Sequence, residues 1–267
     1  MFPILFSIGP FTLHTYGLLV ALGTFLALEL TLYFAKKDGF GSLQIKENLY
    51  ELFFYLLVSG ILGARFFYVI THFKEFTGDL LSIFKVWQGG LVSFGGLFGA
   101  SLGFLVWKRK NKNILPWKKA LDWCAPAFGF GHALGRLGCF AGGCCFGAPT
   151  DKAWGVVFSN PQSLAPLWVT LHPAQIYEFI FLSFLGSFLW WKSLKKKILQ
   201  LADGMLFLQY LIFYSLGRFL IDFFRGDEEK FFYLTPGQNF SILLFLSALF
   251  LRKFFLRSNS KQTPLSI

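Results

Sequence analysis

Long uninterrupted runs of apolar residues are the feature that most restricts how this chain can fold. Each run covers about 17 to 25 residues, which as a helix is long enough to cross the roughly 30 Å hydrocarbon core of a bilayer. Only 15% of the residues are charged, against about a quarter in soluble domains. The sequence therefore predicts an all-α, polytopic membrane protein with about seven transmembrane helices, at Phe11–Phe34, Leu49–Phe73, Gly90–Trp107, Ala120–Phe140, Pro173–Trp191, Gly204–Phe224 and Phe240–Phe255.

The basic residues set the expected orientation. The net charge is +11, and seventeen lysines and arginines lie at the ends of odd-numbered spans or in the segments that follow them, against four on the other side. Because basic loops stay in the cytoplasm, this asymmetry predicts an outer N-terminus and a cytoplasmic C-terminus. Such loops suit an anionic lipid surface, so the charge gives no reason to expect a nucleic acid partner.

We expect one integral membrane domain over residues 1–267. The segment 146–171 contains three prolines and two tryptophans, which favours a periplasmic or interfacial loop, and residues 256–267 form an expected cytoplasmic basic tail. The four cysteines, Cys124, Cys139, Cys144 and Cys145, fall in one region, so they do not form a distributed disulfide framework.

Four arginines lie within or beside the predicted spans, namely Arg65, Arg136, Arg218 and Arg225. A charge at membrane depth needs an interfacial position, a polar ligand or a carboxylate such as Glu51, Glu178 or Asp222. We favour a functional role for Arg136 and Arg218. For Arg225, a side chain that snorkels to the membrane interface is at least as good an explanation as a functional role. Arg218, Asp222 and Arg225 are spaced to share one helical face, which could hold a phosphate headgroup because guanidinium forks match phosphate geometry.

A polar turn opens the fifth predicted span. Pro173 suits a first helical turn, and His172, Gln175 and Glu178 are spaced to share one face. Such a face could frame a site. The same spacing is equally consistent with an interfacial turn and a paired, buried Glu178.

Two further features have both a structural and a functional interpretation. The pairs Gly89-Gly90 and Gly95-Gly96 permit close helix packing, and they also let a ligand approach the backbone. Tyr16 opens the first span, where an aromatic belt at the outer interface explains it as well as a binding site does.

The segment 131–147 combines one arginine, one histidine, three cysteines and six glycines. Its cysteines have three interpretations: soft metal ligands, a redox or acyl-carrying nucleophile beside Arg136, or small residues packed near a site that others build. Because Cys144 and Cys145 are adjacent, their spacing is poor for zinc. We favour the packing interpretation over metal binding.

Several separated segments resemble the prolipoprotein diacylglyceryl transferase family, in the family's order and over nearly the whole chain. No single motif is decisive, but the ordered set is specific. The segments are Tyr16-Gly17-Leu18, Leu62-Gly63-Ala64-Arg65 with Tyr68-Val69, Gly89-Gly90-Leu91 with Gly95-Gly96-Leu97, Gly135-Arg136-Leu137-Gly138, Trp154-Gly155, His172-Pro173-Ala174-Gln175-Ile176-Tyr177-Glu178, Gly217-Arg218-Phe219 with Asp222-Phe223-Phe224-Arg225, and Gly237-Gln238.

The resemblance implies a multi-pass enzyme of the bacterial inner membrane. Such an enzyme transfers the diacylglyceryl group of phosphatidylglycerol to the lipobox cysteine thiol in the signal peptide of a preprolipoprotein, the first step of lipoprotein maturation. Glycerol-1-phosphate leaves, and no cofactor takes part. The implied partners are phosphatidylglycerol, the prolipoprotein signal peptide and membrane lipids.

The resemblance also implies roles for individual residues. Arg136 and Arg218 would bind and polarise the phosphate with support from Arg225, Tyr16 would contact the headgroup, and Asp222, where the family usually has glutamate, would orient Arg218. The remaining residues of the implied substrate-binding set are Gln175, Glu178, Gly95, Gly96, Cys139 and Cys144.

The chain departs from the family at several polar positions. Phe94 stands where the family has a histidine, Cys139 and Gly142 stand at two asparagine positions, and Cys144 stands at a glutamate position. His132 and His172 are the candidate replacements for the missing base. The departures leave two alternatives: a paralogous membrane transferase with another acceptor or a cysteine-based covalent intermediate, and a non-catalytic lipid-binding scaffold.

Overall fold

The structure is a computed structural model that describes residues 1–8, 11–76, 78–85, 90–111, 114–227 and 233–260. The chain divides into two compact units. The first comprises Met1–Phe34 with Lys118–Ile267, and the second comprises Ala35–Trp117.

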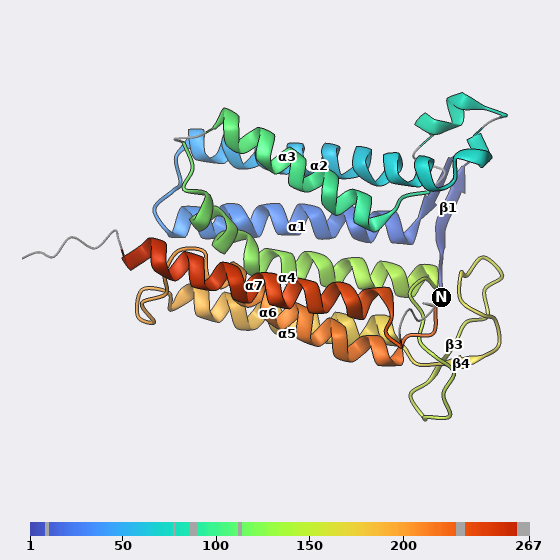
Figure 1. The fold of residues 1–267 in the computed structure, drawn as a ribbon. Coiled ribbons are helices and arrows are strands. Elements are labelled where there is room, and N and C mark those ends of the chain that lie inside the picture. The colour runs from blue at the N-terminus through green and yellow to red at the C-terminus, as the bar shows by residue number, and fades with distance from the viewer. Residues whose placement is uncertain (9–10, 77, 86–89, 112–113, 228–232, 261–267) are drawn as a thin grey trace, which may run out of the picture. The chain divides into compact units, whose positions relative to one another are not determined.

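The first unit is a bundle of long helices, which are α1 (Thr15–Lys37), α4 (Trp117–Gly142), α5 (Ala174–Leu194), α6 (Met205–Ile221) and α7 (Pro236–Ser260) (Figure 1). Leu185 and Leu189 of α5 pack with Leu206 and Tyr210 of α6 and with Ala125 of α4 in a buried core. Most of the buried residues of α4 have small side chains, which let the neighbouring helices approach closely.

Glycines set the closest helix contacts of this unit. A methyl group on Gly129 of α4 would lie 2.6 Å from the Cα of Gly186 on α5. A methyl group on Gly23 of α1 would lie 2.5 Å from the carbonyl oxygen of Gly131 on α4. Neither distance is possible for a real side chain, so both crossings require glycine and hold α4 between α1 and α5.

A buried acid on α4 fixes the start of α6. The carboxylate of Asp122 accepts hydrogen bonds from the backbone N–H groups of Gly204, Leu206 and Phe207 at 2.8 to 3.1 Å. Lys196 also donates to Asp122 at 2.8 Å. Because the first N–H groups of a helix have no partner within it, an acid in this position stabilises the helix and ties α6 to α4.

The second unit is a pair of closely packed helices, α2 (Leu43–Thr71) and α3 (Ser93–Lys110), with two short 3-10 helices, Phe73–Phe76 and Leu80–Phe84. Gly95 and Gly99 of α3 face Gly63 and Ser59 of α2, and a methyl group on Gly95 would lie 2.5 Å from the carbonyl oxygen of Gly63. The glycine-rich run of α3 therefore has a packing role in this unit.

Two small antiparallel sheets accompany the helices. β1 (Ile4–Ile8) pairs with β2 (Phe11–His14) in a register that opposes Ile4 to His14, and β3 (Val156–Val157) pairs with β4 (Thr170–Leu171). The second sheet lies in the segment between α4 and α5. There, Phe158, Ala165 and Leu171 form a small core, against which Phe140 and Phe146 pack.

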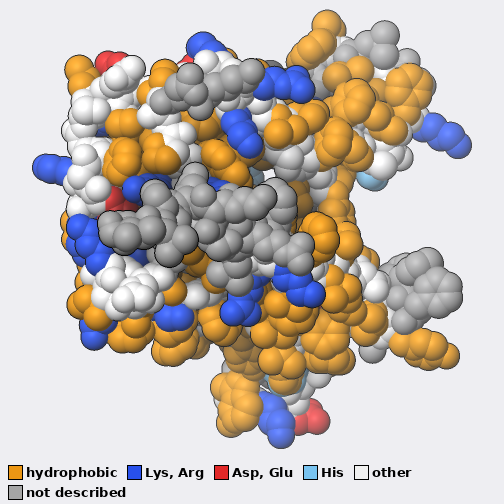
Figure 2. Space-filling view, turned by 60° about the vertical axis from the view of Figure 1, so that its left-hand side comes forward, with side chains coloured by type: hydrophobic (Ala, Val, Ile, Leu, Met, Phe, Trp, Pro, Cys, Tyr) orange, Lys and Arg blue, Asp and Glu red, His pale blue; other side chains and the backbone are white. Residues whose placement is uncertain are grey.

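The predicted helical class is confirmed, and each predicted span overlaps one of the helices α1 to α7. Within the part of the chain that the structure describes, three helical segments, at Thr15–Lys37, Leu43–Thr71 and Met205–Phe224, have the length and apolar composition to cross a membrane. Large hydrophobic side chains such as Phe25, Phe184 and Leu220 are more than half exposed. Hydrophobic side chains cover much of the surface visible in Figure 2, as expected for a membrane protein.

The first predicted span begins too early, and the last helix extends further than predicted. Residues Phe11–His14 form a strand, so the helix begins at Thr15. The alternating pattern Phe11-Thr12-Leu13-His14 is the strand signal within this apolar run. Helix α7 extends to Ser260, so 256–260 of the predicted tail are helical, and 261–267 lie outside the described residues, as do Gly89 and Lys230.

Candidate active site

The carboxylate of Glu178 holds two arginines together in the first unit. Arg136 comes from the last two turns of α4, Glu178 from the start of α5 and Arg218 from the end of α6. Arg136 Nε lies 2.5 Å from Glu178 Oε2, in an ion pair whose angle is not that of a hydrogen bond. Arg218 Nη1 donates to the other carboxylate oxygen, Oε1. All three side chains are at least 87% buried, so solvent weakens these interactions little.

A second carboxylate fixes the other side of Arg218. Asp222 Oδ1 lies 2.9 Å from Arg218 Nη1, and Thr235 Oγ1 donates to Asp222 Oδ2 at 2.6 Å. A methyl group on Gly237 would lie 2.2 Å from Asp222 Oδ2, so glycine is required for α7 to approach this pair. Arg218 is therefore clamped between Glu178 and Asp222 in one defined orientation.

Arg225 lies beyond the end of α6 and not on the helical face that the spacing predicted. A 3-10 turn at Asp222–Phe224 ends the helix, and the backbone of Arg225 is extended. Its guanidinium forks onto Asp227 with distances of 2.9 Å and 2.7 Å, and Nε lies 3.9 Å from Asp222. The side chain of Asp227 is more exposed than those of Glu178 and Asp222. An incoming anion can therefore take the place of Asp227 on Arg225 more readily than it can displace either of the other two carboxylates.

His172 belongs to a chain of side-chain hydrogen bonds. Its Nδ1 lies 3.0 Å from the hydroxyl of Tyr177, which accepts a hydrogen bond of 2.8 Å from Trp154 Nε1. The His172 ring also meets the edge of Phe224, two residues from Asp222 and next to Arg225. These contacts hold the imidazole in one orientation against Phe224, the residue that precedes Arg225.

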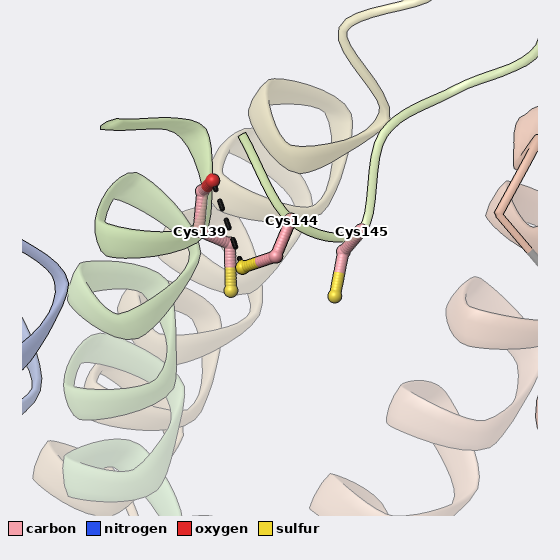
Figure 3. Close-up of side chains that lie close together, drawn as sticks. All are labelled: Cys139, Cys144 and Cys145. Atoms are coloured by element: carbon pink, nitrogen blue, oxygen red, sulfur yellow. Dashed lines mark hydrogen bonds between the residues drawn. The ribbon is translucent and has the colours of Figure 1, made fainter. Parts of the chain in front are cut away.

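The three cysteines of the glycine-rich segment come together. The sulfurs of Cys139, Cys144 and Cys145 all lie within 4.8 Å of one another, and Cys144 Sγ lies 3.8 Å from the carbonyl oxygen of Cys139 (Figure 3). Gln175, which is 1% exposed, donates to the carbonyl oxygen of Cys144 at 2.8 Å.

Neighbouring groups act on the thiol of Cys145. Hydrogen bonds with the thiols of Cys139 and Cys144, and then the positive charges of Arg225 and Arg136, lower the pKa of the Cys145 thiol. The charges of these two arginines therefore reach the thiol cluster.

His132 and Tyr16 lie near the same end of α4. The ring of His132, one turn before Arg136, lies 5.4 Å from that of Tyr214 on α6. Tyr16 is 46% exposed, and it lies along Gly138, where a methyl group would come within 3.2 Å of its ring. Gly138 thus lets Tyr16 lie over the turn of α4 that carries Cys139.

Other predicted site residues lie in the second unit. Gly95 and Gly96 are on α3, and their predicted contact with substrate stays a prediction. Phe94 precedes them and is 53% exposed.

Arg65 does not pair with Glu51, which the sequence offered as a partner. It donates to the carbonyl oxygens of Ser82 and Ile83 at 2.6 Å and 2.8 Å, whereas Glu51 binds Lys110 at 2.5 Å.

Sequence reasoning missed three members of the site. Thr235 fixes Asp222, Asp227 takes the fork of Arg225, and Tyr214 lies against His132. The only signal for Thr235 was its position directly before Pro236, the first residue of α7. Asp227 follows Arg225 so closely that the two could have been recognised as a local pair.

The fold and the site together define a class: a helical membrane protein with buried arginines, carboxylates and thiols gathered at one end of its helices. The family model for prolipoprotein diacylglyceryl transferase matches residues 3–253. The chain belongs to this family, which confirms the resemblance of the ordered motifs.

Curated relatives match along most of their length. The chain is similar to the phosphatidylglycerol–prolipoprotein diacylglyceryl transferase of Clostridium tetani, with 33% identity over 94% of this chain and 96% of the relative. It is also similar to transferase 2 of Clostridium perfringens, with 33% identity over 90% of each chain. The enzyme of Fusobacterium nucleatum is 32% identical over 98% of this chain and 99% of its own length.

Proposed function

We propose that this protein transfers the diacylglyceryl group of phosphatidylglycerol to the thiol of a lipobox cysteine in a prolipoprotein signal peptide. The observation that carries the proposal is the pair of buried guanidinium groups, Arg136 and Arg218, held on the single carboxylate of Glu178. An ordered arginine pair of this kind suits a phosphate that gains charge as it leaves. The family membership and the printed names of the relatives support the same reaction.

In this reaction the acceptor sulfur attacks the glyceryl carbon that carries the phosphate ester. The carbon–oxygen bond breaks, the thioether forms, and glycerol-1-phosphate leaves with the electron pair of the broken bond. Arg136 and Arg218 bind the phosphate oxygens and stabilise the added charge. Arg225 supports them by exchanging Asp227 for the phosphate, and Asp222 keeps Arg218 oriented.

The remaining roles concern the headgroup and the thiol proton. Tyr16, exposed beside Gly138, contacts the glycerol headgroup. We assign the proton-accepting role to His172, because Tyr177 orients its imidazole through Nδ1. His132 is the second candidate for this role, and Gln175 holds the peptide of Cys144 at the edge of the site.

The proposal places the protein in the bacterial inner membrane as a seven-span protein with an outer N-terminus and a cytoplasmic C-terminus. The support is the excess of lysine and arginine in loops after odd-numbered spans. The site then opens to the outer leaflet, where a signal peptide delivers its cysteine after translocation.

The test is expression of the protein in a bacterial strain depleted of its own prolipoprotein diacylglyceryl transferase. We expect restored growth and thioether-lipidated lipoprotein with the wild type, and neither with Arg136→Ala. Absence of rescue and of lipidated product with membrane-inserted wild-type protein would refute the function and favour a paralogue with another acceptor or a lipid-binding scaffold.

A further inference from the structure

The cysteine cluster forms a compact group of three sulfurs that the phosphate chemistry above leaves unused. Cys139 lies in the last turn of α4, and Cys144 and Cys145 lie in the turn that follows (Figure 3). Their three Sγ atoms lie within 4.8 Å of one another. Cys139 is buried, and the other two are half-buried, so the cluster is reachable from one side.

The backbone conformation lets the adjacent residues Cys144 and Cys145 act as ligands of one metal ion. Adjacent side chains in an extended chain point in opposite directions, which makes neighbouring cysteines poor joint ligands. Here the chain turns through left-handed conformations at Gly143, with φ of 78°, and at Cys145, with φ of 57°. Such a φ is uncommon at a residue other than glycine, because the Cβ atom crowds the backbone. The turn brings two adjacent thiols to the thiol of Cys139.

Contacts with surrounding elements hold this turn in place. Gln175 of α5 donates to the carbonyl oxygen of Cys144. The backbone N–H of Leu164 donates to the carbonyl oxygen of Gly142 at 3.1 Å. A methyl group on Gly143 would lie 2.0 Å from Ser163 Oγ, so the segment between α4 and α5 packs directly on the turn. The thiols are thus preorganised by residues outside the cluster.

The geometry and charge of the cluster suit a soft divalent cation. Three sulfurs at about 2.3 Å from one zinc ion lie about 3.8 Å apart in a tetrahedral site, which the observed cluster reaches by small side-chain rotations. Thiolates select zinc over hard cations. Three thiolates outweigh the charge of one zinc ion, and the buried guanidinium of Arg136, about one turn before Cys139 on α4, brings positive charge to the same end of the helix.

We propose that Cys139, Cys144 and Cys145 bind one zinc ion and leave its fourth coordination position for the thiol of the acceptor cysteine. This inference rests on the proposed function and adds to it a device for activating the thiol. It gives the cysteines a role at positions where the family has asparagine and glutamate.

The acceptor thiol binds the zinc ion as thiolate, and its proton passes through water to His172. The metal-bound sulfur attacks the glyceryl carbon, the sulfur–carbon bond forms, and the carbon–oxygen bond to phosphate breaks. The phosphate oxygen keeps the electron pair, and the neutral thioether leaves the metal because it is a weaker ligand than a thiolate. No oxidant or reductant takes part.

The first experiment measures metal content in the full-length protein, purified in detergent under reducing conditions with zinc in the growth medium. We expect about one zinc ion per chain in the wild type. Cys139→Ser, Cys144→Ser and Cys145→Ser should each lose most of it. Cys124→Ser is the matched control, because Cys124 is buried on the same helix outside the cluster and contacts Thr31. It should keep its zinc.

The second experiment replaces zinc by cobalt and records the sulfur-to-cobalt charge-transfer absorption of the wild type. Addition of a lipobox peptide with a free cysteine should change this absorption, and the same peptide with serine should not. Wild-type protein that holds no zinc or cobalt while its thiols are reduced would overturn the proposal, as would a disulfide within the cluster in the active protein. A peptide effect that does not depend on the cysteine would overturn the role of the fourth position.

Failure of this inference and failure of the proposed function give different results. If the reduced, metal-free protein lipidates prolipoprotein at the full wild-type rate, the zinc role is wrong and the transferase function stands. If zinc binds through the three cysteines but no diacylglyceryl transfer occurs, the metal site stands and the acceptor reaction is wrong. Thermal unfolding of each variant identifies those that fail to fold, and the zinc content of the wild type decides the metal site without them.

Discussion

Glu178 is the residue whose replacement tests the buried arginine cluster most sharply. It is 3% exposed and contacts Arg136 and Arg218 at once. In Glu178→Gln the amide oxygen can still accept from one guanidinium, while the negative charge shared by both is lost. We therefore expect the variant to be less stable and, at the same time, to bind an added anion more readily.

The magnitude follows from the burial. Removing one partner of a buried ion pair costs about 3–5 kcal/mol, and the remaining amide acceptor places this change near the lower end, at about 3 kcal/mol. For a chain of this size, 1 kcal/mol shifts the melting temperature by about 2–4 °C, so the expected decrease is about 6–12 °C. Phosphate replaces the missing charge, so it should restore part of the difference through binding to the folded state.

The assay is thermal unfolding in detergent, followed by tryptophan fluorescence, with and without inorganic phosphate. Glu47→Gln is the control because Glu47 is exposed on α2, and it should change stability by less than about 0.5 kcal/mol. A Glu178→Gln protein that melts with the wild type would refute the claim that this carboxylate holds the cluster together. Equal stabilisation of both proteins by phosphate would refute the claim that the arginines receive the anion.

Three other predictions concern neighbouring groups. Asp122→Ala removes the acceptor of three backbone N–H groups and leaves Lys196 with less of its charge partner, so we expect a loss of about 3 kcal/mol in thermal unfolding, and no loss would contradict the tie between α4 and α6. Burial alone would lower the pKa of Lys196, but its ion pairs with Asp122 and Asp203 outweigh this effect and raise its pKa above 10.5. The stability from this group is complete below the unfolded pKa of lysine and is lost as the pH rises through the raised folded pKa. The difference in melting temperature between the wild type and Lys196→Gln should therefore hold near pH 8 and shrink as the pH rises through the folded pKa of Lys196. A difference that grows with pH would contradict this prediction. Tyr177→Phe removes the hydroxyl that orients His172 and should lower kcat about tenfold and shift the pH profile of transfer, whereas a change in KM alone would indicate a purely structural contact.

The helices could be predicted from sequence because their signal is local. Apolar runs that are long enough to cross a bilayer predict the positions of α1 to α7 to within several residues. The length of such a run and the polar residues that end it can both be read directly from the sequence. The N-terminal hairpin was missed because Phe11–His14 continues an apolar run into α1, and its partner strand lies upstream. The contact of Gly129 with Gly186 joins residues 57 positions apart, which no local pattern reveals.

The charged residues that meet around Arg218 could be named from the sequence, but their arrangement and several of their partners could not. Arg136, Arg218 and Glu178 could be selected from the sequence because charged residues are rare in apolar segments. The sequence could not predict that Glu178 contacts both arginines, since one carboxylate can pair with either arginine or with both. The cysteines show the same limit, because adjacent residues appeared unfavourable as joint ligands until the left-handed turn at Gly143 and Cys145 was known.

The central claim is that the arginine cluster transfers a diacylglyceryl group to a cysteine thiol. The most direct test incubates purified protein with phosphatidylglycerol labelled in its acyl chains and a synthetic lipobox peptide, and measures the peptide by mass spectrometry. We expect a peptide that gains one diacylglyceryl group at its cysteine with the wild type, and little or no modified peptide with Arg136→Ala or Arg218→Ala. Unmodified peptide after incubation with folded wild-type protein, or equal modification by the arginine variants, would contradict it.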